Sequence, residues 1–228
     1  CKKINSILMN FTNAISGNRI PFLKNTLLLI ISSVFFIYWL STFLGTTDFA
    51  NWFLENTLVF IFLAVLVLTY KKLQFSDLSY LLIFIYLLLH VYGSKYTYAE
   101  NPFGYWLQDF FDLGRNHYDR IVHFSFGFLL AYPMRELFLV GFKFPNWVSW
   151  TLPIEITLSI GAFYELIEWA VADLFFKEQG AAYLGIQGDI WDAQKDIFLA
   201  FLGAVIATTL ISIIKKKGNF NNKVKAIP

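Results

Sequence analysis

The sequence predicts an all-α, polytopic integral membrane protein built as a six-helix transmembrane bundle. Hydrophobic residues make up 57% of the 228 residues, and the mean hydropathy is +0.55. Charged residues make up only 15%, whereas soluble domains contain about 25%. Six apolar segments are long enough to cross a bilayer, in which a helix satisfies all of its own backbone groups.

The six expected spans cover, in chain order, residues 26–44, 55–70, 78–93, 119–138, 148–173 and 192–214. The second is short for a crossing, so we expect either that side chains at its ends snorkel or that residues 51–54 extend it. We expect residues 4–23 to lie in the interface as an amphipathic segment. No linker divides the chain, which predicts an N-terminal segment (1–25), one membrane domain (26–214) and a basic tail (215–228).

Basic residues predict the orientation of the bundle. They adjoin the start of the first span, the connections after the second and fourth, and the end of the sixth, at Lys24, Lys71, Lys72, Arg135, Lys143 and Lys215. Because cytoplasmic connections are enriched in Lys and Arg, both termini are predicted to be cytoplasmic. We expect Glu136 to pair with Arg135 or Lys143 on that side.

Aromatic residues mark the expected membrane interfaces. The connection at residues 102–112 is too short to span and predicts an outer interfacial helix between the third and fourth spans, with Tyr105 and Trp106 at the headgroups. We also interpret a set of tryptophans as interface anchors: Trp39, Trp52, Trp147, Trp150 and Trp191.

Ionisable side chains gather at the predicted outer ends of the last three spans. They form pairs at helical spacing: Asp119 with His123, Glu165 with Glu168, and Asp192 with Asp196. Each pair shares one helix face. Small residues continue the same faces at Gly127, Gly161, Ala200, Gly203, Ala204 and Ala207. Small residues allow close helix packing, so these faces are predicted to point at one another.

Buried carboxylates in a membrane require compensating charge. We expect a divalent metal, Zn, Mn or Mg, with ligands drawn from His123, Asp119, Glu168, Asp192 and Asp196. The alternatives are structural. The aspartates can cap helices, His90 can be a hydrogen-bonded core residue, and Arg120 and Lys195 can be the counter-ions of the glutamates.

Four motifs resemble the YjdF family of bacterial inner-membrane proteins. They are Glu55-Asn56-Thr57-Leu58, His90-Val91-Tyr92-Gly93, the run from Arg115 to Phe124, and the run from Gly188 to Asp196. This resemblance implies a bacterial cytoplasmic (inner) membrane location and supplies no reaction. A more distant likeness is to VanZ-like membrane proteins, through Asp119-Arg120 with His123 and through Asp192 with Asp196.

The leading functional hypothesis is a metal-dependent hydrolase or transferase acting on a lipid or lipid-linked substrate at the outer leaflet. Its expected catalytic residues are Glu165, His123 and Asp119. Its expected substrate-binding residues are Arg115, Arg120, Lys195 and His117. The alternatives are a proton- or ion-coupled transporter and a non-catalytic membrane assembly factor.

Net charge and cysteine content limit the partners and the covalent cross-links that the chain can have. A formal net charge of +2 is too small to predict nucleic-acid binding, so membrane lipids are the expected partners. The single cysteine, Cys1, excludes an intrachain disulfide. A lipid-modified Cys1 would place Lys2 and Lys3 outside, against the charge rule, so we interpret Cys1 as a remnant of processing or cloning.

Overall fold

The computed structural model describes residues 20–175 and 187–225, with side chains described to Lys215. This part of the chain contains seven α-helices and no strand. The helices are α2 (Thr26–Gly45), α3 (Phe49–Thr69), α4 (Asp77–Lys95), α5 (Pro102–Phe111), α6 (Tyr118–Glu136), α7 (Asn146–Phe175) and α9 (Asp192–Lys225). A short 3₁₀ turn, η1 (Phe22–Lys24), precedes α2, and a π-helical turn, η2 (Leu137–Gly141), continues α6.

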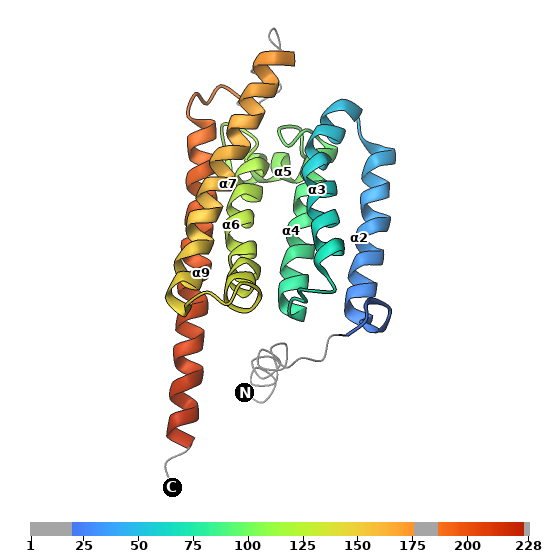
Figure 1. The fold of residues 1–228 in the computed structure, drawn as a ribbon. Helices are drawn as coiled ribbons and strands as arrows, with labels where there is room; N and C mark the ends of the chain where they lie inside the picture. The colour runs from blue at the N-terminus through green and yellow to red at the C-terminus, as the bar shows by residue number, and fades with distance from the viewer. Residues whose placement is uncertain (1–19, 176–186, 226–228) are drawn as a thin grey trace.

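Five of these helices are long and apolar enough to cross a membrane: α2, α3, α4, α6 with η2, and α9. The predicted all-helical membrane class is therefore confirmed. The fifth expected span corresponds to α7, which is not among the five. Its 30 residues lie alongside α9 over most of the bundle (Figure 1), but they carry four carboxylates: Glu155, Glu165, Glu168 and Asp173. The count of six spans remains a prediction.

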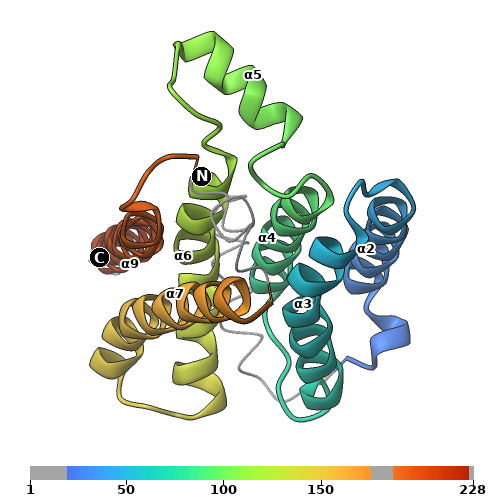
Figure 2. The same ribbon diagram turned by 90° about the horizontal axis from the view of Figure 1, so that it is seen from above.

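The helices form two groups that meet at the centre of the bundle. Seen from above, α2, α3 and α4 lie on one side, while α6, α7 and α9 lie on the other (Figure 2). α6 joins the groups because it packs against α4, α7 and α9. α2 begins and α9 ends on the same side of the bundle (Figure 1). We call this side the basic end, and the opposite side, where α6 and α9 begin, the polar end.

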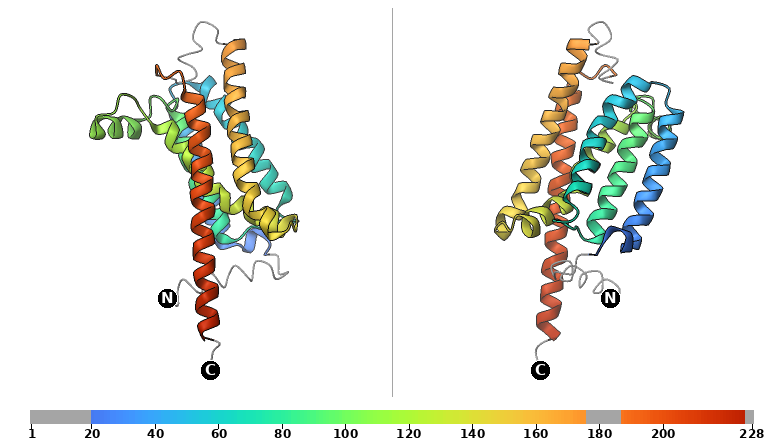
Figure 3. Two further views of the ribbon diagram at one scale, coloured as in Figure 1. Left: turned by 90° about the vertical axis from the view of Figure 1, so that its left-hand side faces the viewer. Right: turned by 45° about the vertical axis from the view of Figure 1, so that its right-hand side comes forward.

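α5 lies outside the bundle and projects sideways from the polar end (Figure 3). Asn101 fixes its start, because the side-chain oxygen accepts hydrogen bonds from Phe103 N and Gly104 N. Its aromatic side chains are exposed, among them Phe103, Trp106 and Phe110. A sideways helix with exposed aromatic residues fits the interfacial helix that the sequence predicts between the third and fourth spans.

Two helices are longer than the sequence predicts. α3 begins at Phe49, two residues before the extension to residue 51 that the sequence allows, because the Asp48 side chain caps it by accepting from Asn51 N at 2.9 Å. α9 continues to Lys225 through the predicted basic tail, and it extends past the other helices at the basic end (Figure 1). The expected interfacial segment at residues 4–23 falls mostly outside the described residues.

The backbones of α6 and α9 approach each other closely, as the small-residue stripe predicts. A Cβ on Gly127 would lie 1.8 Å from Ala200 O, and one on Gly203 would lie 2.3 Å from Phe124 O. Ala200 and Ala204 are fully buried in this contact. Only residues without a Cβ fit at these two glycines, so the contact fixes how the start of α6 faces the start of α9.

Two side-chain predictions are wrong. Trp52 is not an interface anchor: it is 3% exposed, and its indole N–H donates to Thr42 Oγ1 at 3.1 Å. Glu136 does not pair with Arg135 or Lys143. Its carboxylate instead caps the start of α4, where it accepts hydrogen bonds from the Ser76 N–H and hydroxyl and from the Ser79 hydroxyl. Neutral donors at a helix start satisfy this carboxylate without an ion pair.

Candidate functional site

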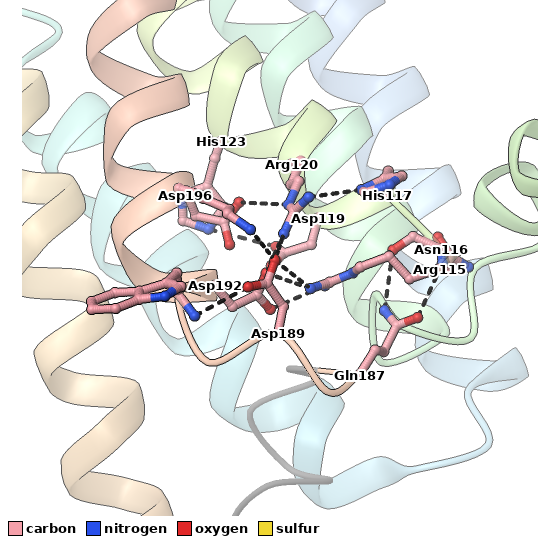
Figure 4. A network of polar contacts seen from close by, with 12 residues as sticks. Arg115, Asn116, His117, Asp119, Arg120, His123, Gln187, Asp189, Asp192 and Asp196 are labelled. Carbon is pink, nitrogen blue, oxygen red and sulfur yellow. Dashed lines mark hydrogen bonds and ion pairs between the residues drawn. The ribbon is translucent and has the colours of Figure 1, made fainter. Parts of the chain in front are cut away.

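Five charged side chains tie the start of α6 to the start of α9 (Figure 4). Arg115 binds Asp192 through two hydrogen bonds, of 2.5 Å and 3.0 Å. Arg120 NH2 donates to Asp189 at 2.5 Å and to Asp192 at 2.9 Å. Lys195 Nζ donates to Asp189 at 2.6 Å. We call this network the Arg–Asp latch: Arg115, Arg120, Asp189, Asp192 and Lys195.

The turn that enters α9 is held in the same network. Asn116 N donates to Gln187 Oε1 at 3.0 Å, and Gln187 Nε2 donates back to Asn116 O at 3.1 Å. Hydrogen bonds from Lys195 and Arg120 hold the pKa of Asp189 well below its usual value. Asp189 is therefore ionised at neutral pH, as a charge-assisted hydrogen bond requires.

Directly beside the latch, Asp119, His123 and Asp196 bring one possible ligand atom each to within 4.8 Å of one another. We call these three residues the carboxylate–histidine group. Asp119 and His123 come from the first two turns of α6, and Asp196 comes from the second turn of α9. The Gly127–Ala200 approach of α6 and α9 is what allows this meeting. The sequence assigns all three residues to the expected metal site.

Asp196 is the group's unsatisfied member. Its side chain is 2% exposed, and Oδ1 accepts no hydrogen bond from the described residues. The nearest cation is Arg120 Nε, at 4.0 Å, and that nitrogen also lacks a hydrogen-bond partner there. Buried carboxylate oxygens are rarely left without a donor or a cation. Asp196 Oδ1 is therefore a buried oxygen that has no hydrogen-bond donor among the described residues and an arginine only at the limit of ion-pair distance.

The other expected metal ligands lie elsewhere. Asp192 is taken up by the two arginines of the latch. Glu168 is not among the residues that meet within 4.8 Å. It lies almost one helical turn beyond Glu165, whose Oε1 is 3.4 Å from His123 Nε2. His123 Nε2 therefore lies between Asp119, at 3.5 Å, and Glu165.

The remaining expected site residues are held by protein groups. Arg120 and Lys195, read as counter-ions of the glutamates, bind Asp189 and Asp192 instead. His117 Nδ1 accepts a hydrogen bond from Arg120 NH1 at 3.2 Å. Burial and the positive charges of Arg120 and Arg115 lower the pKa of His117, which favours the neutral imidazole that this bond needs.

His90 is a hydrogen-bonded core residue, as its structural interpretation predicts. The Tyr98 hydroxyl lies 2.7 Å from Nδ1, and Nε2 lies 3.2 Å from the carbonyl oxygen of Glu55. A carbonyl only accepts, so Nε2 carries the proton and Nδ1 accepts from Tyr98. Both ring nitrogens are used, which leaves His90 no free nitrogen for a metal.

Sequence reasoning missed Glu55 and Tyr164 as parts of this region. The Tyr164 hydroxyl donates to Glu55 Oε2 at 2.6 Å and so connects α7 to α3. Glu55 belongs to one of the motifs that carry the family resemblance, which was a signal of its importance. Its partner, 109 residues away, could not be inferred from helical spacing.

A cavity of about 360 Å³ opens from the carboxylate–histidine group into the bundle. The polar part of the cavity lining consists of Asp119, His123, His90, Tyr98 and Tyr164. Apart from Tyr86, the rest of the lining is apolar and comes from α3, α4, α6 and α7, with residues such as Leu58, Phe62, Phe126 and Ile160. The cavity is therefore amphipathic, with its chemical groups gathered at one end.

The comparisons with known proteins agree with a membrane location. The family described as "Predicted membrane protein (DUF2238)" matches residues 27–217. The chain is 36% identical, over 197 residues, to the inner membrane protein YjdF of Escherichia coli strain K12, covering 86% of this chain and 90% of that protein. No solved structure matches the chain.

Proposed function

This chain belongs to the DUF2238 family of predicted membrane proteins, and from that premise we propose that it is a metal-dependent hydrolase or transferase of the inner membrane. Its substrate is a lipid or lipid-linked molecule in the outer leaflet. The observation that carries the proposal is the amphipathic cavity, which joins the carboxylate–histidine group to an apolar space within the bundle.

The cavity fits an acyl or polyprenyl chain better than it fits an ion. Beyond its polar end, its lining is made of aliphatic and aromatic side chains. Four of these residues are also exposed on the lipid-facing surface of α3 and α7: Leu58, Ile61, Val65 and Ile160. A lipid tail can enter between the two helices without leaving the bilayer, and its head then lies against Asp119 and His123. An ion-coupled transporter would need polar groups along this path.

The donor set of the group suits a divalent metal. Two carboxylates and one imidazole favour Zn or Mn, and less so Mg, which prefers oxygen ligands and water. The ion also supplies the cationic partner that Asp196 Oδ1 lacks among the described residues. When bound, it polarises a carbonyl or phosphoryl oxygen and lowers the pKa of a coordinated water.

Glu165 has the position of the general base. Its Oε1 lies 3.4 Å from Nε2 of His123, and His123 lines the cavity. In hydrolysis, the water oxygen bonds to the carbonyl carbon or phosphorus while its proton passes to Glu165. The leaving oxygen then takes that proton as the ester bond breaks. In this proposal the latch holds α6 and α9 in register.

Metal content is the first test. The full-length protein, purified in detergent with an affinity tag that binds no metal, is expected to carry about one divalent ion per chain by elemental analysis. His123→Ala and Asp196→Asn are expected to lose the ion. Glu165→Gln is the matched control, because it removes the base and keeps all three ligands. Wild-type protein without a stoichiometric metal would contradict the proposal.

Turnover is the second test. Wild-type protein and Glu165→Gln are reconstituted in nanodiscs of bacterial polar lipid extract, with and without added Zn²⁺ or Mn²⁺, and lipid products are followed by mass spectrometry. We expect lysolipid, diacylglycerol or an exchanged headgroup in the wild type and at least about 100-fold less in Glu165→Gln. Equal product formation by both proteins would remove Glu165 from the mechanism.

A further inference from the structure

The basic end of the bundle contains a second charged cluster, far from the carboxylate–histidine group. It lies where α6 ends and α7 begins (Figure 1). Arg135 is in the last turn of α6, roughly 24 Å along the helix from Asp119 at about 1.5 Å per residue. The function proposed above uses none of the residues in this cluster.

Two cations share one aromatic ring in this cluster. The guanidinium carbon of Arg135 lies 4.0 Å from the ring centroid of Trp150, and Lys215 Nζ lies 5.9 Å from the same centroid. The three side chains come from α6, α7 and α9. Stacking occupies the face of the guanidinium and leaves its edge available for hydrogen bonds in the ring plane.

No carboxylate neutralises these two cations within the described part of the chain. None of the ion pairs there involves Arg135 or Lys215. Glu136 follows Arg135 in sequence, but its carboxylate is turned to Ser76 and Ser79 at the start of α4. Like charges held around one ring repel each other unless an anion lies between them.

Arg135 also has an unused buried donor. Its side chain is 8% exposed, NH2 donates to Asn146 Oδ1 at 3.2 Å, and Nε finds no acceptor among the described residues. Such a donor costs free energy comparable to a lost hydrogen bond, so buried guanidinium groups normally have an acceptor.

The start of α7 adds a third positive feature. Ser149 N donates to Pro145 O, so the N–H groups of residues 146–148 precede the helical hydrogen-bond ladder. They give this end of the 30-residue helix a partial positive charge. Asn146, which binds Arg135, is the first residue of the helix.

We propose that Arg135, Trp150, Lys215 and the start of α7 form a binding site for the phosphate group of an anionic phospholipid at the basic end of the bundle. A phosphate oxygen accepts from the outer edge of the Arg135 guanidinium and neutralises the two cations, as arginine–phosphate recognition usually does. The exposed Lys215 and the indole at the membrane boundary then hold the headgroup, while the acyl chains remain in the bilayer.

The test measures thermal unfolding of the full-length protein in detergent with three added probes. They are a short-chain phosphatidylglycerol, the matching diacylglycerol, which lacks the phosphate, and inorganic phosphate. We expect a saturable rise in Tm with phosphatidylglycerol alone. A rise of equal size with diacylglycerol would overturn the proposal. A rise of equal size with inorganic phosphate would overturn its lipid part and assign the site to free phosphate.

Two substitutions and a control locate the binding. Arg135→Gln and Lys215→Gln are expected to weaken the phosphatidylglycerol response by about tenfold in midpoint concentration. Lys215 is exposed, so its substitution leaves the fold intact even if Arg135→Gln does not. Lys72→Gln is the matched control, since it removes an exposed cation from the same end and should keep the full response. An unchanged midpoint in Lys215→Gln would contradict the proposal.

Discussion

The Arg–Asp latch and the carboxylate–histidine group lie side by side on the same two helices, but their charges are compensated differently. In the latch, Asp192 receives hydrogen bonds from both Arg115 and Arg120. In the group, Asp196 is equally buried and Oδ1 receives none from the described residues. The comparison separates a carboxylate that is paired with two arginines from a buried carboxylate oxygen that has no hydrogen-bond donor among the described residues.

Replacing one aspartate by asparagine in each cluster gives the largest expected difference in the free energy of unfolding. Asp192→Asn leaves two buried or partly buried guanidinium groups short of a carboxylate, and we expect it to lower the free energy of unfolding by about 3 kcal/mol. Asp196→Asn removes a carboxylate that lacks a partner, so metal-free protein should change by less than about 1 kcal/mol or become more stable. Unfolding in mixed detergent micelles measures both.

Equal destabilisation by Asp192→Asn and Asp196→Asn would end the distinction between the two clusters. Metal content gives the complementary measurement on the same proteins. Asp192→Asn should retain the ion when the protein is folded, whereas Asp196→Asn should lose it. Loss of metal in both variants at full stability would return Asp192 to the ligand set that the sequence predicts.

Both clusters depend on the close approach of α6 and α9. A glycine substitution with a smaller expected effect on stability tests this approach. Gly127→Ala places a methyl group against the backbone of Ala200 and is expected to cost about 2 kcal/mol. Gly161→Ala is the matched control, because its Cβ would lie 3.8 Å from the Ala200 Cβ, an ordinary contact. Both substitutions gain the same helix propensity, so the difference in unfolding free energy isolates the contact. Similar values for the two would contradict close backbone packing.

The smallest expected effect is a pH dependence of the stability that Asp189 contributes through the latch. The pKa of Asp189 is lower in the folded protein than in the unfolded chain, because Lys195 and Arg120 bind the carboxylate. Its stabilising contribution is therefore present above the unfolded pKa of about 4 and is lost as the pH falls below it. The stability difference between wild type and Asp189→Asn should be constant above about pH 5 and shrink towards pH 3.

A second variant checks the cause of that pH dependence. Lys195→Gln removes the hydrogen bond that lowers the Asp189 pKa most. The loss of stability with acid should then be smaller than in the wild type and should be complete at a higher pH, because the folded and unfolded pKa values of Asp189 lie closer together. A pH profile identical to that of the wild type would assign the effect to another carboxylate.

Local patterns were enough to predict much of the fold. Composition and segment length gave the helical membrane class, and the spacing of Gly127, Gly203 and the alanines gave the inward faces of α6 and α9. The longer helices were missed for two reasons. The start of α3 depends on the Asp48 cap, and the C-terminal part of α9, at the basic end, has no apolar signal.

The sequence predicted that the side chains of the site form a cluster, but it did not predict which side chain pairs with which. Helical spacing placed Asp119, His123, Asp192 and Asp196 at the same level, where the structure has them. It could not tell that Asp192 faces Arg115 while Asp196 faces His123, because these choices depend on contacts across more than 70 residues. Glu55 and Tyr164 were missed for the same reason.

The distance in sequence between the two halves of the latch sets an order for assembly. α2, α3 and α4 pack against one another through neighbouring segments, and they are synthesised first. Arg115 meets Asp192 only after a further 77 residues have been made. Until α9 enters the membrane, the start of α6 holds two arginines, an aspartate and a histidine without their α9 partners. The polar end is thus completed last during biosynthesis, and its ion pairs serve as the closing step of helix association.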